Sequence, residues 1–211
     1  MTGELFEITA NKLKVVSLDG HRISIRNVEL NNSYDNISVI IPGKTLIEIN
    51  KILNGGVDDI VKIYFTDKHI LFEFESTVVL SRLIEGEYYK IDKMLSSDYE
   101  TKITVNKKEM LDSIDRTTLL MKEAEKKPVI IDIKDNSMGL AMNSSIGSMD
   151  EEIDAVKEGK DILIGFNPRF LIDALRVIDD EEITLYMINP KAPCFIRDKD
   201  CLLYTSDAAD E

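Results

Sequence analysis

The sequence predicts an α+β fold made of two copies of one small domain, with antiparallel sheets on one side and helices on the other. Three observations support this prediction. Apolar and polar residues alternate with period two over several short runs, which is typical of strands with one buried face. Three runs with helical spacing separate groups of these strands. Distant segments also resemble one another, which indicates an internal duplication.

The first thirty residues predict a β-meander. Alternating apolar positions fill residues 5–8, 13–16 and 23–26. The pair Asp19-Gly20 stands before the third run, and Asp-Gly is among the strongest short-range signals for a hairpin turn.

A helix is expected next. Pro42 opens it, and the run 54–56, Asn-Gly-Gly, stops it. Further strand-like runs follow at 60–65, 70–74 and 78–83. The helical spacing is carried by Leu46, Ile49, Ile52 and Leu53.

The duplication has a constant offset. Residues 44–53 match residues 169–178 in charge and apolarity at most positions (169 − 44 = 125), and residues 5–8 match residues 130–133 (130 − 5 = 125). A unit of this length is a compact domain rather than a solenoid repeat. A second helix, at about 106–122, precedes the second copy, and its counterpart in the first copy would lie upstream of Met1.

Both ends of the chain are therefore expected to be cut. The strand at 78–86 should have its counterpart at 203–211, and that segment has no strand pattern. Residues 201–211 resemble the translated read-through of a sequencing adapter, so we interpret them as a non-native tail. The alternative is a genuine disordered acidic tail.

Composition limits the class of protein. The chain has 211 residues, is 44% hydrophobic and 31% charged, and contains no apolar run long enough to span a membrane. Two cysteines are too few for a disulfide framework, so a reducing, cytoplasmic location is expected. The net charge of −13 argues against a protein whose bulk surface binds phosphates, although a small basic face on an acidic body remains open.

Four motifs, in order along residues 1 to about 198, are similar to motifs of the bacterial DNA polymerase III β sliding clamp family. They are Ser17-Leu18-Asp19-Gly20-His21-Arg22-Ile23, Val39-Ile40-Ile41-Pro42-Gly43-Lys44, Leu83-Ile84-Glu85-Gly86-Glu87-Tyr88 and Ile164-Gly165-Phe166-Asn167-Pro168-Arg169-Phe170-Leu171. The resemblance implies tandem DNA-clamp domains. Residues 1–95 would be the middle domain without its first helix, and residues 96–200 the C-terminal domain without its last strand.

The resemblance also implies a function. Clamp subunits have three similar domains, and two subunits close a ring around double-stranded DNA without reading its sequence. The ring tethers the replicative polymerase as a processivity factor, and it is not an enzyme. Helices line the hole, where a weakly basic surface permits sliding. Its expected DNA contacts here are Lys44, Lys51, Arg116, Arg169 and Arg176.

The residues alone leave this DNA assignment open, because acidic side chains are interleaved with the basic ones. An ordinary solvated face with pairs such as Glu48 with Lys44 explains the same pattern. Lys44 matches a DNA-contact position of the family. Its neighbour is Gly43 where some relatives carry Arg.

The resemblance further implies a peptide-binding pocket. Short linear peptides of the polymerase and the clamp loader would bind there, with apolar anchors and polar rims. Tyr89 stands where a proline is often found. Core packing is the alternative role for Ile23 and Met94. The expected pocket residues are Leu18, Gly20, His21, Arg22, Ile23, Tyr89, Lys93 and Met94.

A subunit contact is expected at Leu119 and Leu120, which match the family's homodimer interface. Adjacent residues do not both face one narrow core stripe, so one of the two should be exposed. The partner surface belongs to a first domain that this sequence lacks, so we expect this chain alone not to close a ring.

The residues leave two other function classes open. A metal-dependent nuclease or phosphoesterase could use Asp19 and His21, but Asp-Gly favours a simple turn. His69 has no Cys or His neighbour at metal-ligand spacing, and no Walker loop or nucleophile elbow occurs. We therefore expect no catalytic residue, metal or cofactor. An acidic protein-interaction domain unrelated to replication is the second alternative.

Overall fold

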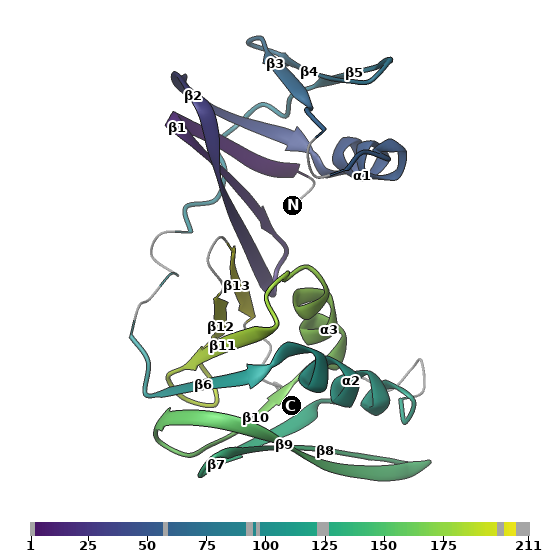
Figure 1. The fold of residues 1–211 in the computed structure, drawn as a ribbon, viewed down its shortest axis with the longest axis vertical. Coiled ribbons are helices and arrows are strands. Elements are labelled where there is room, and N and C mark those ends of the chain that lie inside the picture. Colours follow the sequence, from purple (N-terminus) through teal and green to yellow (C-terminus); the bar gives the residue numbers. More distant parts are fainter. Residues whose placement is uncertain are drawn as a thin grey trace. The chain divides into compact units, whose positions relative to one another are not determined.

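The computed structural model describes residues 3–56, 59–91, 95, 98–121, 127–197 and, for the backbone, 201–205. The chain forms two compact units (Figure 1). The first contains Met1–Gly20 and Ile25–Leu95, and the second contains His21–Ser24 and Ser96–Glu211.

The first unit begins with two long strands, β1 (Gly3–Leu18) and β2 (Arg22–Pro42), joined by the expected turn at Asp19-Gly20. Helix α1 (Gly43–Ile52) follows Pro42 directly. It ends where Leu53 becomes extended, with the Leu53 N–H donating to the Ile49 carbonyl. Ile49 is the helix's buried residue and belongs to the core of this unit.

A three-stranded antiparallel sheet completes the first unit, in the order β3 (Lys62–Phe65), β4 (His69–Phe74) and β5 (Thr77–Arg82). Strand β4 alternates strictly between buried and less buried residues. Because successive side chains of a strand point to opposite faces, its apolar residues reach the core together. The buried core side chains of this unit are Phe6, Ile41, Ile49, Ile70, Phe72, Phe74 and Leu83.

The second unit has a larger antiparallel sheet in the order β13-β12-β11-β6-β9-β8-β7-β10. The strands are β6 (Thr101–Asn106), β7 (Val129–Lys134), β8 (Ser137–Ser144), β9 (Gly147–Gly159), β10 (Ile162–Phe166), β11 (Glu182–Met187), β12 (Cys194–Arg197) and β13 (Cys201–Thr205).

Helices α2 (Lys107–Thr118) and α3 (Pro168–Arg176) pack against each other in the second unit (Figure 1). Both start at an asparagine whose side chain accepts a backbone N–H: Asn106 accepts from Glu109, and Asn167 accepts from Arg169. Such caps satisfy one of the amide donors that the first helical turn leaves without a partner. Met110 and Ile114 of α2 and Leu171 of α3 are fully buried in the core.

The elements of the two units correspond at the expected offset. Helix α1 begins at Gly43 and α3 at Pro168 (168 − 43 = 125). Ala10 within β1 has a left-handed φ of 54°, and Asp135, between β7 and β8, has a φ of 48° (135 − 10 = 125). The predicted α+β fold with tandem repeats is confirmed.

Two predicted boundaries were wrong. Helix α2 ends at Thr118 rather than near Lys122, which lies outside the described residues. The hydroxyls of Thr117 and Thr118 bond to the carbonyls of Ile114 and Asp115, and i→i+3 backbone bonds then tighten residues 119–121. Strand β3 begins at Lys62 and not at residue 60.

The expectation that residues 203–211 carry no strand was also wrong for their first part. Strand β13 pairs antiparallel with β12, with Cys194 opposite Thr205. It takes the place beside β12 that β5 takes beside β4. An open strand edge accepts any extended segment within reach, so backbone pairing overrides a weak side-chain pattern.

Candidate nucleic-acid and protein interfaces

Two of the predicted DNA contacts occupy the same place in the two repeats. Lys44 is the second residue of α1 and Arg169 the second residue of α3, and both are exposed. Within the described ranges, neither side chain has an ion-pair partner. Their position is electrostatically unfavourable for the isolated helix, because the N-terminus of a helix already carries partial positive charge. Each site instead combines a cation with a helix N-terminus, which together favour an anion.

The other three predicted contacts are paired with carboxylates. The Lys51 ammonium lies 2.9 Å from Glu48, whereas the pair between Glu48 and Lys44 that the sequence suggested is not formed. The Arg176 guanidinium lies 3.3 Å from Asp115.

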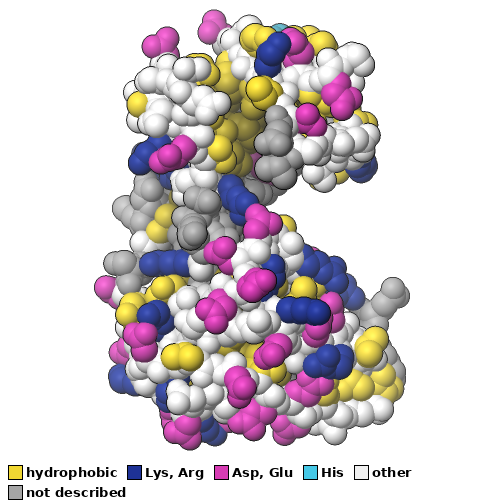
Figure 2. Space-filling view, viewed as in Figure 1, with side chains coloured by type: hydrophobic (Ala, Val, Ile, Leu, Met, Phe, Trp, Pro, Cys, Tyr) yellow, Lys and Arg dark blue, Asp and Glu magenta, His cyan; other side chains and the backbone are white. Residues whose placement is uncertain are grey.

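The fifth cation, Arg116 on α2, makes a two-pronged contact with Glu151 on β9. Acidic and basic side chains are interleaved over the visible face of the second unit (Figure 2).

The hairpin tip His21–Ser24 belongs to the second unit through contacts with α3. The Arg22 Nη1 donates to the Asp173 Oδ2 at 2.8 Å, and the Arg22 guanidinium lies 4.3 Å from the centre of the Phe170 ring. The His21 ring stacks on Phe170 at 5.8 Å with an angle of 29° between the planes. Two predicted pocket residues are thus held by one turn of α3.

Phe170 and Asp173 were not predicted as neighbours of the hairpin. Arg22 and Asp173 lie 151 residues apart in the sequence, so no local pattern links them. The sequence held one clue to these neighbours. An arginine and a histidine at a turn commonly pack on an aromatic ring, and an arginine commonly pairs with a carboxylate.

The remaining predicted pocket residues have different environments. Leu18 is half-buried at the end of β1, Gly20 is exposed in the turn, and Ile23 is only 4% exposed, in keeping with core packing. Tyr89 is 58% exposed. Lys93 and Met94 lie outside the described residues.

A groove of about 630 Å³ lies in the first unit, between β1, β2 and the segment 83–91, and includes Tyr89. The Tyr88 hydroxyl, also in this groove, donates to the Val16 carbonyl at 3.1 Å. Burial raises the pKa of Tyr88, and the charge of Glu4 adds to this effect.

Leu119 and Leu120 differ in solvent exposure, as predicted for adjacent residues. Leu119 is 76% exposed, while Leu120 packs against the core of the second unit. A Cβ at Gly147, the first residue of β9, would lie 3.3 Å from the Leu120 side chain, so α2 ends close to the turn between β8 and β9. Ile146 in that turn is 54% exposed.

In the described part of the chain, no group of three or more His, Cys, Asp or Glu side chains is placed to hold a metal ion. None of the helices in these ranges is long and apolar enough to cross a membrane.

The two units define a protein class of tandem α+β domains, each with a sheet and a helix at equivalent positions. The chain belongs to the DNA polymerase III beta subunit family. The family's central domain matches residues 1–90, and its C-terminal domain matches residues 92–204.

Known proteins agree with this membership. The chain is 33% identical over 201 residues to the "Beta sliding clamp" of Staphylococcus aureus (strain Mu50 / ATCC 700699), a match that covers 94% of this chain and 53% of the relative. The chain therefore spans about half the length of the curated relatives that it matches.

Solved structures match as well. A crystal structure from Eubacterium rectale ATCC 33656, described as a candidate DNA polymerase III beta subunit, is 64% identical with a TM-score of 0.95 and covers 97% of this chain and 56% of that one. The DNA polymerase sliding clamp of Bacillus subtilis is 32% identical with a TM-score of 0.92, and the same shares are covered.

Proposed function

We propose that this chain forms part of a sliding clamp, a processivity factor that encircles double-stranded DNA and tethers the replicative DNA polymerase during replication. It acts by binding and tethering and catalyses no reaction. The family membership and the names of the relatives support this proposal. Its further parts are a cytoplasmic location, a homodimeric ring in the full-length protein, and peptide contacts with the polymerase and the clamp loader.

One observation carries the DNA part of the proposal. Lys44 and Arg169 repeat at the N-terminal ends of equivalent helices, and neither is neutralised by a carboxylate in the described residues. The chain as a whole has a net charge of −13, so most of its surface repels a phosphate backbone. Two exposed cations on an acidic protein suit a loose, sequence-independent contact, because DNA held inside a ring needs little phosphate affinity. Lys51 and Arg176 are weaker contributors in this proposal, since each shares its charge with an acidic neighbour.

The salt dependence of duplex binding tests this part. Each phosphate contact contributes a slope of about −0.9 in log Kobs against log salt concentration. Replacing both Lys44 and Arg169 by Ala should reduce the slope by about 2. Lys134→Ala is the matched control, because it removes one exposed cation, paired with Asp132, from strand β7. Equal effects of the double variant and the control would remove the support for a specific DNA-facing surface.

The peptide part rests on the hairpin tip. His21 and Arg22 present a ring and a guanidinium that Phe170 and Asp173 hold in place. Titration with a short peptide that has a glutamine followed by a leucine–phenylalanine end tests it. Binding that Arg22→Ala weakens supports the pocket, and absence of binding by a full-length subunit favours an interaction domain unrelated to replication.

We also propose the domain limits 1–95 and 96–200, with 201–211 as a non-native tail. Sequencing the genomic DNA around this reading frame tests the origin of that tail.

A further inference from the structure

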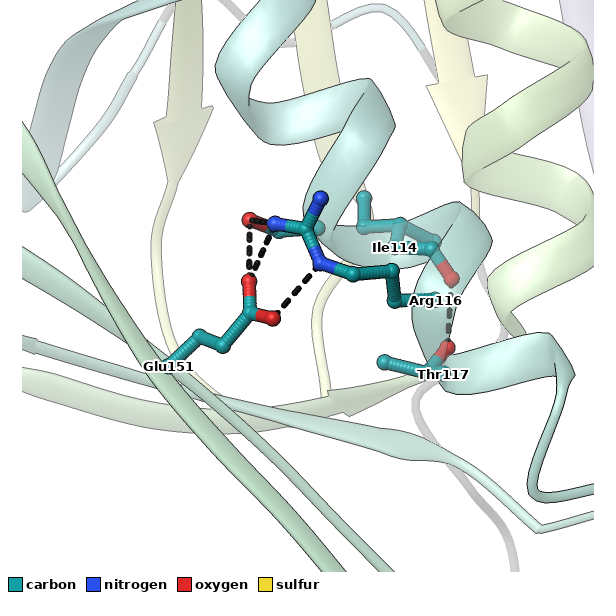
Figure 3. Close-up of polar contacts among 5 residues, drawn as sticks. Ile114, Arg116, Thr117 and Glu151 are labelled. Carbon is teal, nitrogen blue, oxygen red and sulfur yellow. Dashed lines mark hydrogen bonds and ion pairs between the residues drawn. The ribbon is translucent and has the colours of Figure 1, made fainter.

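The guanidinium of Arg116 makes two hydrogen bonds to the carboxylate of Glu151. Its Nε donates to the Glu151 Oε1 at 2.6 Å, and its Nη2 donates to the Glu151 Oε2 at 2.5 Å (Figure 3). Two parallel bonds between a guanidinium and a carboxylate fix both the distance and the orientation of the pair. The contact joins helix α2 to strand β9, which are 35 residues apart along the chain.

Ser113 forms hydrogen bonds to both members of this pair. Its hydroxyl donates to the Glu151 Oε2 at 2.8 Å and accepts from the Arg116 Nη2 at 3.0 Å. Ser113 is only 1% exposed. A phosphate that took Arg116 away would leave the Glu151 carboxylate with the Ser113 hydroxyl but without its two guanidinium donors, and the loss of hydrogen bonds to a charged group is costly. The pair also has no net charge, so it attracts DNA weakly.

The backbone of Arg116 leads directly to the exposed leucine. Its carbonyl accepts the Leu119 N–H at 3.2 Å, and the Thr117 carbonyl accepts the Leu120 N–H at 3.0 Å. The residue that follows α2, Leu119, is therefore hydrogen-bonded to the backbone of Arg116, whose side chain Glu151 holds. Leu119 points outward and is 76% exposed, while the side chain of its neighbour Leu120 lies near Gly147 at the start of β9.

We propose that Arg116 is a positioning residue that fixes the Leu119 surface through Glu151 and Ser113, rather than a contact to DNA. The inference rests on the proposed function, in which Leu119 contacts a second subunit. It separates Arg116 from Lys44 and Arg169, which have the same charge but no carboxylate partner among the described residues. The ordering of one apolar side chain before binding reduces the entropy that association must overcome.

Amide hydrogen exchange in this chain tests the positioning role. Arg116→Ala and Glu151→Gln should each raise the exchange rates of residues 119–121 by about 5-fold, the change expected for loss of a partly exposed ion pair. Arg116→Lys should restore only part of the protection, because an ammonium cannot make the two-pronged contact. Glu158→Gln is the matched control, since it breaks a 2.7 Å pair with Lys102 elsewhere in the same unit. It should leave these amides unchanged.

Duplex binding supplies the second readout, because the two roles predict different results. A positioning Arg116 predicts an unchanged salt slope in Arg116→Ala and no gain in affinity in Glu151→Gln. A DNA contact predicts a slope reduced by about 1 in Arg116→Ala and tighter binding when Glu151 no longer competes. That second pattern, or unaltered exchange at 119–121 in both variants, overturns the proposal.

A full-length subunit separates this inference from the proposed function. Leu119→Ser should weaken self-association, and so should Arg116→Ala and Glu151→Gln. If Leu119→Ser has no effect while the exchange rates still rise, the proposed subunit contact fails and the positioning role of Arg116 stands.

Discussion

Ile47 and Ile172 occupy equivalent positions of the two repeats (172 − 47 = 125) but differ tenfold in exposure. Ile47 on α1 is 58% exposed, whereas Ile172 on α3 is 6% exposed. Helix α2 packs against α3 in the second unit, and Ile172 belongs to the core there. The same apolar residue type is therefore a core residue in one copy and a surface residue in the other.

This difference predicts unequal effects of one substitution. Ile172→Ser removes buried apolar atoms and buries a hydroxyl, which should lower the free energy of unfolding by about 3–4 kcal/mol. Ile47→Ser should change it by less than about 0.5 kcal/mol in this chain. Urea unfolding followed by circular dichroism measures both, and similar losses in the two variants would contradict the difference in burial.

The hairpin tip should depend more on Phe170 than on Asp173. The ion pair between Arg22 and Asp173 is exposed, and such pairs contribute at most about 1 kcal/mol. Asp173→Asn should therefore raise amide exchange at residues 21–24 by no more than about 5-fold. Phe170→Ala removes the stacking with His21 and the cation–π contact with Arg22, about 1–2 kcal/mol together, so exchange should rise by about 10-fold. The reverse order would show that charge, not the ring, holds the tip.

The predictable parts of this protein are those with a local cause. Period-two alternation and Asp19-Gly20 define the first hairpin, and Pro42 directly precedes α1, which begins at Gly43. The end of α2 was not predictable in the same way, because the threonine back-bonding at Thr117 competes weakly with helix continuation.

Side-chain partners between elements were the least predictable part. The charge of Arg116 suggested a DNA contact, but its partner Glu151 lies on a strand 35 residues away. Only the folded sheet brings the two together. That one of Leu119 and Leu120 is exposed was predictable, because helix geometry alone separates adjacent residues, but which one it is was not.

The pair between Glu151 and Arg116 should make stability depend on pH. The hydrogen bond from Arg116 holds the pKa of Glu151 below its ordinary value, against the opposing effect of burial, and Ser113 adds a smaller lowering. A carboxyl with a lowered pKa in the folded state contributes stability above its unfolded pKa, about 4.3, and loses it as pH falls through the folded pKa. Glu151→Gln should thus be less stable than wild type at pH 7, and the difference should shrink as pH falls and vanish below the lowered pKa of the folded state. Thermal unfolding at several pH values measures this difference, and a constant gap across the range would exclude the titration of Glu151 as its source.

The pKa of Glu4 is shifted in the opposite direction from that of Glu151. Burial raises its pKa, so its ionised form opposes folding above the folded pKa and ceases to do so once pH falls below the unfolded pKa. Glu4→Gln should therefore be more stable than wild type at pH 7 and equal to it in acid. Loss of stability at pH 7 in this variant would contradict the burial of an unfavourable charge.

Cys194 should be unreactive in the folded protein. Its thiol is fully buried in β12, and burial raises its pKa to about 12. Because the thiolate is the nucleophile, iodoacetamide at pH 8 should alkylate Cys194 very slowly in buffer and readily in urea. Peptide mass spectrometry measures both rates, and equal rates would show that β12 opens often.

Strand β13 should protect the edge of β12. Its backbone pairs with Cys194–Arg197, with Phe195 opposite residue 204 and Ile196 opposite residue 203. A variant that stops at residue 200 leaves this edge unpaired, so amide exchange in β12 should rise and the protein should aggregate more readily, as exposed strand edges do. Strand β4, which keeps its partner β5, is the internal control and should exchange at the wild-type rate. Unchanged exchange in β12 would mean that the pairing with β13 is not populated in solution.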